Sequence, residues 1–176
     1  MKIDGIWGNI FRLAPRQETL TDILQNVPLF RQLTPKELRI LEGLVHIRTY
    51  DTGEEIFVES EPGAGMYVIR NGIVDIKLKH RSDQPLILAE LQAGDFFGEM
   101  ALLGDNTRSA TAIARERSEL IGFFHPDLEE LMSLHAIIGA KIAFGLAQTL
   151  AERLRYTNAQ LREVWEIRGP HEAAIG

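Results

Sequence analysis

Residues 94–112 bring together residue types that suit the binding of a small phosphate ester. Within this stretch, Glu99 opens a short helix-forming run and Arg108 follows further along the chain. An arginine offers a permanent positive charge and a planar fork of donors that matches two phosphate oxygens. Small residues beside these two let a ligand approach the backbone closely; they are Gly98, Ala101, Ser109 and Ala110. The stretch therefore predicts a site for a singly charged phosphodiester.

The two charged side chains are expected to do different tasks. Arg108 is expected to bind the exocyclic oxygens of a cyclic phosphodiester, helped by free backbone N–H groups near Ala101 and Ala110. Glu99 only accepts hydrogen bonds when it is ionised and would repel a phosphate, so it is expected to read a ribose 2′-hydroxyl. Taken singly, Glu99 also fits an acid at a helix start, and Arg108 a surface ion-pair residue. Their combination in one loop favours the ligand site.

Residues 97–103 and 108–112 resemble the phosphate-binding cassette of the cyclic-nucleotide-binding domain family. The family includes protein kinase A regulatory subunits, cyclic-nucleotide-gated channels and the bacterial catabolite activator protein, and the resemblance covers about residues 24–168. Thr107 stands where many members have proline, which changes the stiffness of the loop more than its chemistry. The resemblance implies a non-catalytic regulatory module that senses a cyclic nucleotide. The ligand-binding residues that it implies in residues 94–112, called the cassette below, are Gly98, Glu99, Met100, Ala101, Arg108, Ser109 and Ala110.

The resemblance also implies where the base of the nucleotide is read. In the catabolite activator protein, adjacent hydroxyl residues of the long helix cap the purine, and Thr157 and Asn158 stand in that region here. A second reading of Thr157 is a polar residue that sets the register of a coiled coil. Ser109 stands where cGMP-selective kinase domains have a threonine, so cAMP is the expected ligand and cGMP the alternative.

The surrounding pattern predicts an α+β fold that positions these groups. Thr34, Pro35 and Glu37 form a capping box that predicts a helix over residues 35–44. Asn71-Gly72 predicts a type I′ hairpin. Runs with a period of two predict an antiparallel jelly roll, or double-stranded β-helix, between N-terminal helices and a long C-terminal helix. The runs are 45–50, 55–59, 66–70, 73–79, 86–91, 109–115 and 119–124.

Two helices are expected after the strands, a short one from His125 to about His135 and a long one over residues 137–168. A heptad seam on the long helix, spaced by steps of three and four, predicts a homodimer through this helix. The seam is Ala136, Ala140, Ala143, Ala147, Leu150, Leu154, Thr157, Leu161, Val164 and Arg168, and a second stripe is Ile138, Ile142 and Leu146. The alternative is a helix that lies along its own barrel and uses one stripe only.

The expected division of the chain is an N-terminal extension over residues 1–16, one domain over 17–168 and a flexible tail over 169–176. The 176 residues allow one such domain, and no room is left after residue 168 for a helix-turn-helix. We therefore expect no direct DNA binding. The alternative is a fragment or relative of a cAMP-responsive transcription regulator that lacks its helix-turn-helix. The output is expected to pass to a protein effector that the sequence does not identify.

Composition excludes several other classes of protein. The net charge of −6 argues against a broad nucleic-acid or anionic-membrane surface, and the absence of cysteine excludes disulfides and iron–sulfur clusters. These features favour a cytoplasmic location. A cupin-type metal enzyme would need a His-x-His cluster, which the histidines do not form, so we expect no metal and no catalysis. The histidines are His46, His80, His125, His135 and His171.

Overall fold

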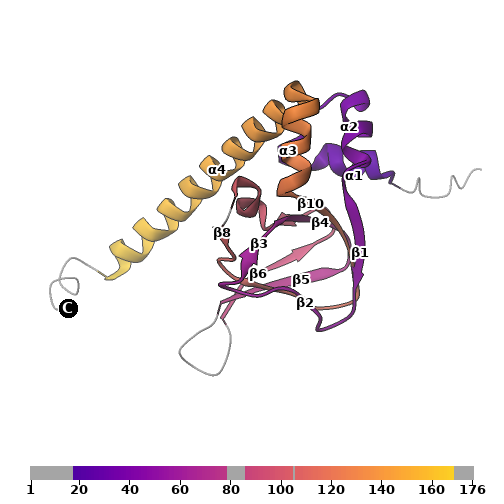
Figure 1. Ribbon diagram of the computed structural model, residues 1–176. Coiled ribbons are helices and arrows are strands. Elements are labelled where there is room, and N and C mark those ends of the chain that lie inside the picture. The colour runs from indigo at the N-terminus through magenta and orange to yellow at the C-terminus, as the bar shows by residue number, and fades with distance from the viewer. Residues whose placement is uncertain (1–17, 79–85, 105, 169–176) are drawn as a thin grey trace, which may run out of the picture.

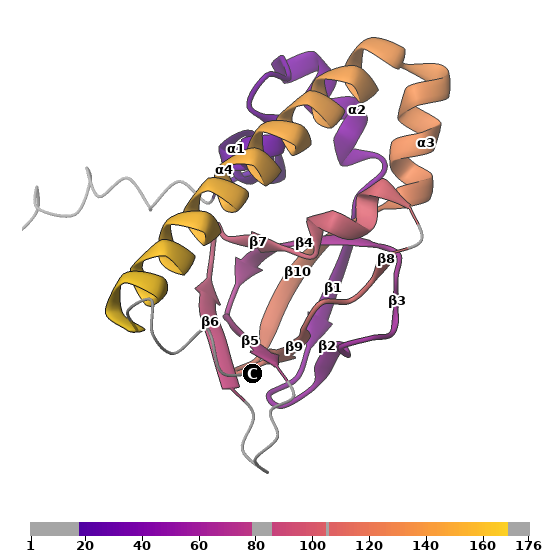
Figure 2. The ribbon, with the colours of Figure 1, turned by 90° about the vertical axis from the view of Figure 1, so that its left-hand side faces the viewer.

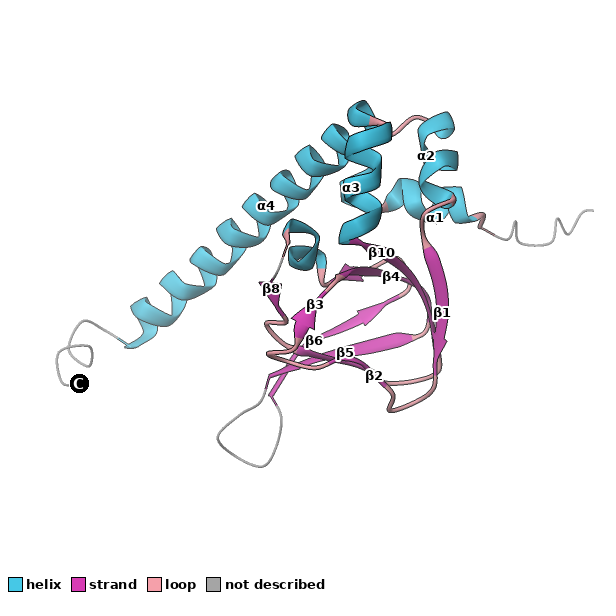
Figure 3. Cartoon of the chain, viewed as in Figure 1, coloured by secondary structure: helices cyan, strands magenta, loops and turns pink. Residues whose placement is uncertain are grey.

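The computed structural model describes residues 18–78, 86–104 and 106–168. These ranges form the predicted α+β architecture, with a helical layer above two antiparallel sheets (Figures 1 and 3). The predicted N-terminal extension and C-terminal tail lie outside the described residues, so the expected domain limits stay predictions. No helix in the described ranges is long and apolar enough to cross a membrane.

The N-terminal helices are α1 (Leu20–Asn26), the short 3₁₀ helix η1 (Pro28–Phe30) and α2 (Pro35–Glu42). The predicted capping box at α2 is confirmed. The Thr34 N–H donates to a Glu37 carboxylate oxygen at 2.7 Å, and the Glu37 N–H donates to the Thr34 hydroxyl at 3.4 Å. Each bond satisfies a backbone donor that the start of a helix leaves without an intrahelical partner.

Two four-stranded sheets form the barrel, in the orders β1-β10-β4-β7 and β2-β9-β5-β6. All seven predicted runs contain a strand, whereas the two-residue strands β3, β7 and β8 were missed because two residues show no period. The strands are β1 (His46–Tyr50), β2 (Glu55–Phe57), β3 (Pro62–Gly63), β4 (Gly65–Asn71), β5 (Ile73–Leu78), β6 (Leu86–Gln92), β7 (Phe96–Phe97), β8 (Asn106–Thr107), β9 (Thr111–Ala114) and β10 (Ser118–Phe124).

The predicted hairpin at Asn71-Gly72 is wrong. β4 pairs with β10 and β7, whereas β5 pairs with β6 and β9, so the turn is a corner at which the chain passes from one sheet to the other. A type I′ turn needs positive φ at both central residues. Gly72 has a φ of 100°, but Ser60 is the only non-glycine residue in the described ranges with positive φ. A Cβ at Gly72 would lie 2.3 Å from the Ser118 hydroxyl, and this close approach is what requires glycine at the corner.

The C-terminal helices are α3 (His125–Leu134) and α4 (Ala136–Arg168). The first half of α4 is fastened to the N-terminal helices. A Cβ at Gly145 would lie 2.6 Å from the Leu29 carbonyl oxygen, and Lys141 Nζ donates to both Glu37 carboxylate oxygens at 2.7 Å. These hydrogen bonds from Lys141 hold the pKa of the Glu37 carboxyl below its ordinary value. The attached half of α4 therefore forms one unit with the N-terminal helices (Figure 2).

The two faces predicted for α4 are exposed to different degrees. The second stripe, Ile138, Ile142 and Leu146, is buried in the main apolar core. Residues 152–166, which continue the predicted seam, are all exposed, and this half of α4 runs away from the helical layer (Figure 1). The helix thus covers its own domain with one stripe and leaves much of the seam uncovered.

Candidate ligand-binding pocket

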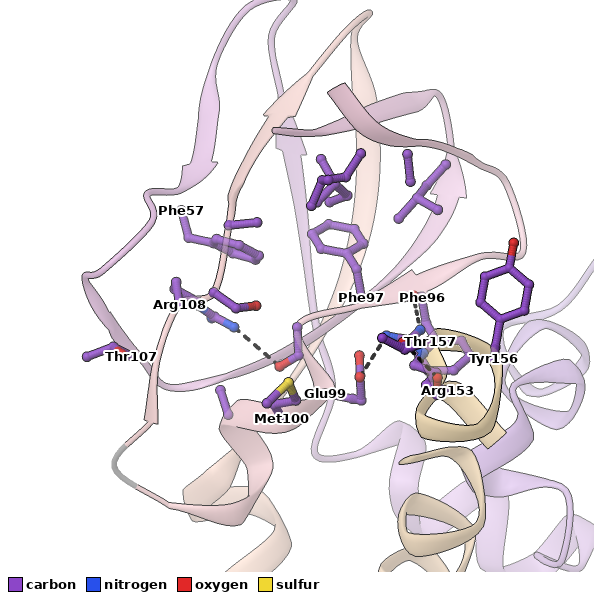
Figure 4. A pocket seen from close by; sticks show the side chains of 18 of the residues that line it. Phe57, Phe96, Phe97, Glu99, Met100, Thr107, Arg108, Arg153, Tyr156 and Thr157 are labelled. Atoms are coloured by element: carbon purple, nitrogen blue, oxygen red, sulfur yellow. Dashed lines mark hydrogen bonds and ion pairs between the residues drawn. The ribbon is translucent and has the colours of Figure 1, made fainter. Parts of the chain in front are cut away.

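A cavity of about 830 Å³ lies between the cassette, the strands and α4 (Figure 4). Residues 96–101 and 107–110 of the cassette line one side of the cavity. Side chains of β2, β5 and β6 add an apolar wall, and the exposed half of α4 closes the far side. The volume is in the range usual for small-molecule sites. The structure thus brings the predicted cassette and the long helix to one pocket.

Glycine shapes the backbone of the cassette. Gly98 has a φ of +77° and precedes the 3₁₀ helix η2 (Glu99–Leu103). A Cβ at Gly98 would lie 2.8 Å from Arg108 Nη1, so glycine lets the guanidinium lie against the backbone. The Ala101 N–H was expected to be free for a ligand, and this was wrong. It donates to the Gly98 carbonyl oxygen at 3.2 Å, because the tight 3₁₀ turn supplies its own acceptor.

Arg108 is a buried cation, only 7% exposed. Its Nη1 donates to the carbonyl oxygens of Gly65 at 2.7 Å and Gly98 at 3.3 Å. No carboxylate of the described residues lies within ion-pair distance, and its buried Nε has no hydrogen-bond partner among them. Burial lowers the pKa of the guanidinium from its ordinary value. Nη1 is thus bound to the protein, while the edge formed by Nε and Nη2 makes no hydrogen bond that the described residues show.

Glu99 is more deeply buried, at 2% exposed, and has an ion-pair partner that sequence reasoning missed. Arg153 Nη1 donates to Glu99 Oε1 at 2.7 Å, and Arg153 Nη2 donates to the Phe96 carbonyl oxygen at 3.3 Å. Glu99 Oε2 is buried with no partner in the described part of the chain, so one acceptor remains unused. This ion pair connects the cassette to α4 (Figure 4).

A signal for Arg153 was present in the sequence. Arg153 precedes Thr157 by one helical turn, so a helix that brings Thr157 to a pocket brings Arg153 to the same face. The structure places Thr157 in the pocket lining, and its hydroxyl donates to the Arg153 carbonyl oxygen at 2.9 Å. Asn158 is exposed and is absent from the lining that the described residues form.

The other predicted residues all line the pocket. Ser109 and Ala110 lie beside Arg108, and Met100 is about half exposed. Sequence reasoning also missed Tyr156 and Gln160, two further lining residues on α4. Within the described ranges, no group of three or more histidines and carboxylates is arranged to hold a metal ion.

Fold and pocket together define a class of protein: an antiparallel jelly roll with a pocket between its cassette and its C-terminal helix. Residues 47–135 match the model of the cyclic nucleotide-binding domain, and the chain belongs to this family.

The chain is similar to proteins of different lengths. The chain is 34% identical over 138 residues to the cyclic AMP receptor protein of Thermus thermophilus, which covers 78% of this chain. It is 32% identical over 114 residues, or 63% of this chain, to human cGMP-dependent protein kinase 2. It spans only 62% and 15% of the lengths of these two relatives. A cyclic nucleotide-binding domain from Methylobacillus flagellatus shares the fold with a TM-score of 0.72 at 21% identity, over 82% of each chain.

Proposed function

We propose that this protein is a non-catalytic regulatory module that binds cAMP. The observation that carries the proposal is Arg108, a buried guanidinium that lines the pocket, has no carboxylate partner in the described ranges and leaves its Nε without a hydrogen bond there. An unpaired buried charge is costly unless a counter-charge is supplied. The anionic phosphodiester of a cyclic nucleotide supplies that charge in a planar, two-pronged arrangement.

The two charged residues divide the ligand between them. The phosphate oxygens accept from Arg108 Nε and Nη2, the edge that the protein leaves unused. The unpaired Glu99 Oε2 accepts from the ribose 2′-hydroxyl, while Oε1 stays with Arg153. A carboxylate in this position, paired with Arg153, only accepts hydrogen bonds, which suits a sugar hydroxyl and disfavours a second phosphate.

The base lies between α4 and the apolar wall that includes β6. The Thr157 hydroxyl donates its hydrogen to the Arg153 carbonyl oxygen, so toward the base it can only accept. It therefore pairs with a donor such as the adenine amino group. Guanine presents a carbonyl oxygen at that position of the ring. This difference, together with Ser109 in the cassette, favours cAMP over cGMP. Asn158 remains a predicted base contact on the same helix.

Calorimetry with cAMP, cGMP and 2′-deoxy-cAMP tests the proposal directly. We expect the tightest binding for cAMP. The loss of the 2′-hydroxyl should weaken binding by about tenfold or more, because a hydrogen bond to a charged group is worth about 1.5–3 kcal/mol. If none of the three ligands gives either heat or a thermal shift, the proposed function is refuted.

We further propose that the ligand draws α4 toward the cassette. Arg153, on the exposed half of α4, contacts the cassette directly, while the first half of the helix is fixed to the N-terminal helices. A ligand bound by both elements favours the closed arrangement and shifts the equilibrium toward it. Hydrogen exchange should therefore show slower exchange in residues 151–166 when cAMP is added. Equal exchange with and without cAMP would rule out the coupling.

The exposed seam of α4 supports a homodimer. Leu154, Leu161 and Val164 are 61%, 54% and 45% exposed and continue the heptad spacing from Ala147. Such a row of large apolar side chains suits a second copy of the same helix. Sedimentation velocity should give a dimer mass that Leu161→Glu reduces to that of a monomer. A wild-type protein that binds cAMP but is monomeric would disprove the homodimer and leave the proposed ligand binding standing.

A further inference from the structure

The charge of Arg108 is buried without an ion-pair partner in the described residues. The guanidinium is buried, and no carboxylate of the described chain pairs with it. Glu99, the nearest buried acid in sequence, is paired with Arg153 instead. Two carbonyl oxygens accept from Nη1, but they contact one corner of a planar cation only. Glu99 still attracts the guanidinium through its charge, but the two form no ion pair, so a group in direct contact with the guanidinium would offset more of its desolvation if it left the donor edge free.

The aromatic ring of Phe57 lies where such a partner is required. The Arg108 guanidinium carbon is 3.9 Å from the centroid of this ring, within the range of a cation–π contact (Figure 4). The ring itself is held in place by neighbours, with the Phe97 ring at 5.8 Å and the Tyr67 ring at 6.2 Å. Phe57 therefore presents a supported aromatic face to the cation.

An irregularity in β2 brings the ring to this position. Successive side chains of a regular strand point to opposite faces. Ile56 and Phe57 are consecutive, yet both pack against the same apolar cluster in the barrel. The register between β2 and β9 shifts between Glu55 and Phe57, and a bulge of this kind redirects a side chain. Without the shift, one of these two side chains would leave the barrel interior.

We propose that Phe57 is a positioning residue that holds the Arg108 guanidinium in the correct orientation before the ligand arrives. The negative face of the ring stabilises the cation without accepting a hydrogen bond from Nε or Nη2. A carboxylate in this place would compete with the phosphate for the same donors. The ring also covers one face of the guanidinium, so the phosphate must approach in the plane of Nε and Nη2. The inference rests on the proposed binding of a cyclic phosphodiester.

Phe57→Leu removes the aromatic face and keeps an apolar side chain, whereas Phe57→Tyr keeps the ring. We expect calorimetry to show cAMP binding about fivefold to thirtyfold weaker for Phe57→Leu, the range for a desolvated cation–π contact, and near wild-type binding for Phe57→Tyr. Ile56→Ala is the matched control because it loosens the same strand and cluster without touching Arg108. Wild-type affinity in Phe57→Leu, or an equal loss in Ile56→Ala, would overturn the proposal.

A ligand-free readout separates this proposal from the proposed function. In the wild-type protein the Arg108 Nε–H should give a single NMR signal that is shifted by the ring current of Phe57. The signal should lose that shift in Phe57→Leu and keep it in Phe57→Tyr and Ile56→Ala. An unshifted wild-type signal would overturn the positioning role. A shifted signal in a protein that binds no cyclic nucleotide would leave the contact intact and refute the proposed function.

Discussion

Arg108→Gln is expected to weaken cAMP binding by about 10²- to 10⁴-fold. The substitution removes the two charge-assisted hydrogen bonds proposed between Arg108 and the phosphate, each worth about 1.5–3 kcal/mol. Isothermal titration calorimetry measures the loss, and at these magnitudes it should leave no heat at micromolar ligand. Arg108→Lys keeps the charge but not the planar fork of donors. Its affinity for cAMP should therefore lie between that of the wild-type protein and that of Arg108→Gln.

The ligand-free stability of Arg108→Gln separates a binding effect from misfolding. The variant loses a buried, unpaired charge, and its amide can still donate to a backbone carbonyl near Gly65 or Gly98. We therefore expect the free energy of unfolding to change by no more than about 1 kcal/mol. Arg70→Gln is the matched control, since Arg70 pairs with Glu119 away from the pocket lining. Near wild-type affinity in Arg108→Gln would contradict the assigned role of Arg108.

Arg153→Met is expected to destabilise the ligand-free protein by about 2–3 kcal/mol, while Glu99→Gln should cost about 1 kcal/mol or less. The two partners of this ion pair are unequally buried, with Glu99 2% and Arg153 49% exposed. Without Arg153, the buried carboxylate loses its ion-pair partner, which is the costly way to break a buried pair. Without the negative charge of Glu99, Arg153 can turn to water, because half of its side chain already meets solvent.

Chemical denaturation of the two single variants and the double variant measures this asymmetry. The double variant should recover most of the stability that Arg153→Met loses, because the carboxylate that lost its ion-pair partner is then absent. Arg155→Met, an exposed arginine on the same helix that does not line the pocket, is the control and should cost little. If Arg153→Met and Glu99→Gln lower the free energy of unfolding equally, the expected asymmetry is wrong, and Glu99 does not depend on Arg153 more than Arg153 depends on Glu99. In either variant, the preference for cAMP over 2′-deoxy-cAMP should shrink.

Local signals predicted the helices and the main strands correctly. The capping box at Thr34 depends on two residues that are three positions apart. Each predicted strand depends on side chains that alternate with a period of two within one short run. The Asn71-Gly72 turn shows where such signals end. A hairpin and a corner between two sheets share the same local pattern, and the difference depends on which distant strands pair with β4 and β5.

The candidate site divides in the same way. The sequence by itself determined that Glu99 and Arg108 lie close together in the chain among small residues, because the whole cassette is one short segment. Only the tertiary structure decided the partners of these charges. Arg153 reaches Glu99 from α4, and Phe57 reaches Arg108 from β2. The physical reason is that hydrogen-bonding and charge chemistry belong to each side chain, whereas burial and pairing depend on contacts between segments far apart in the chain.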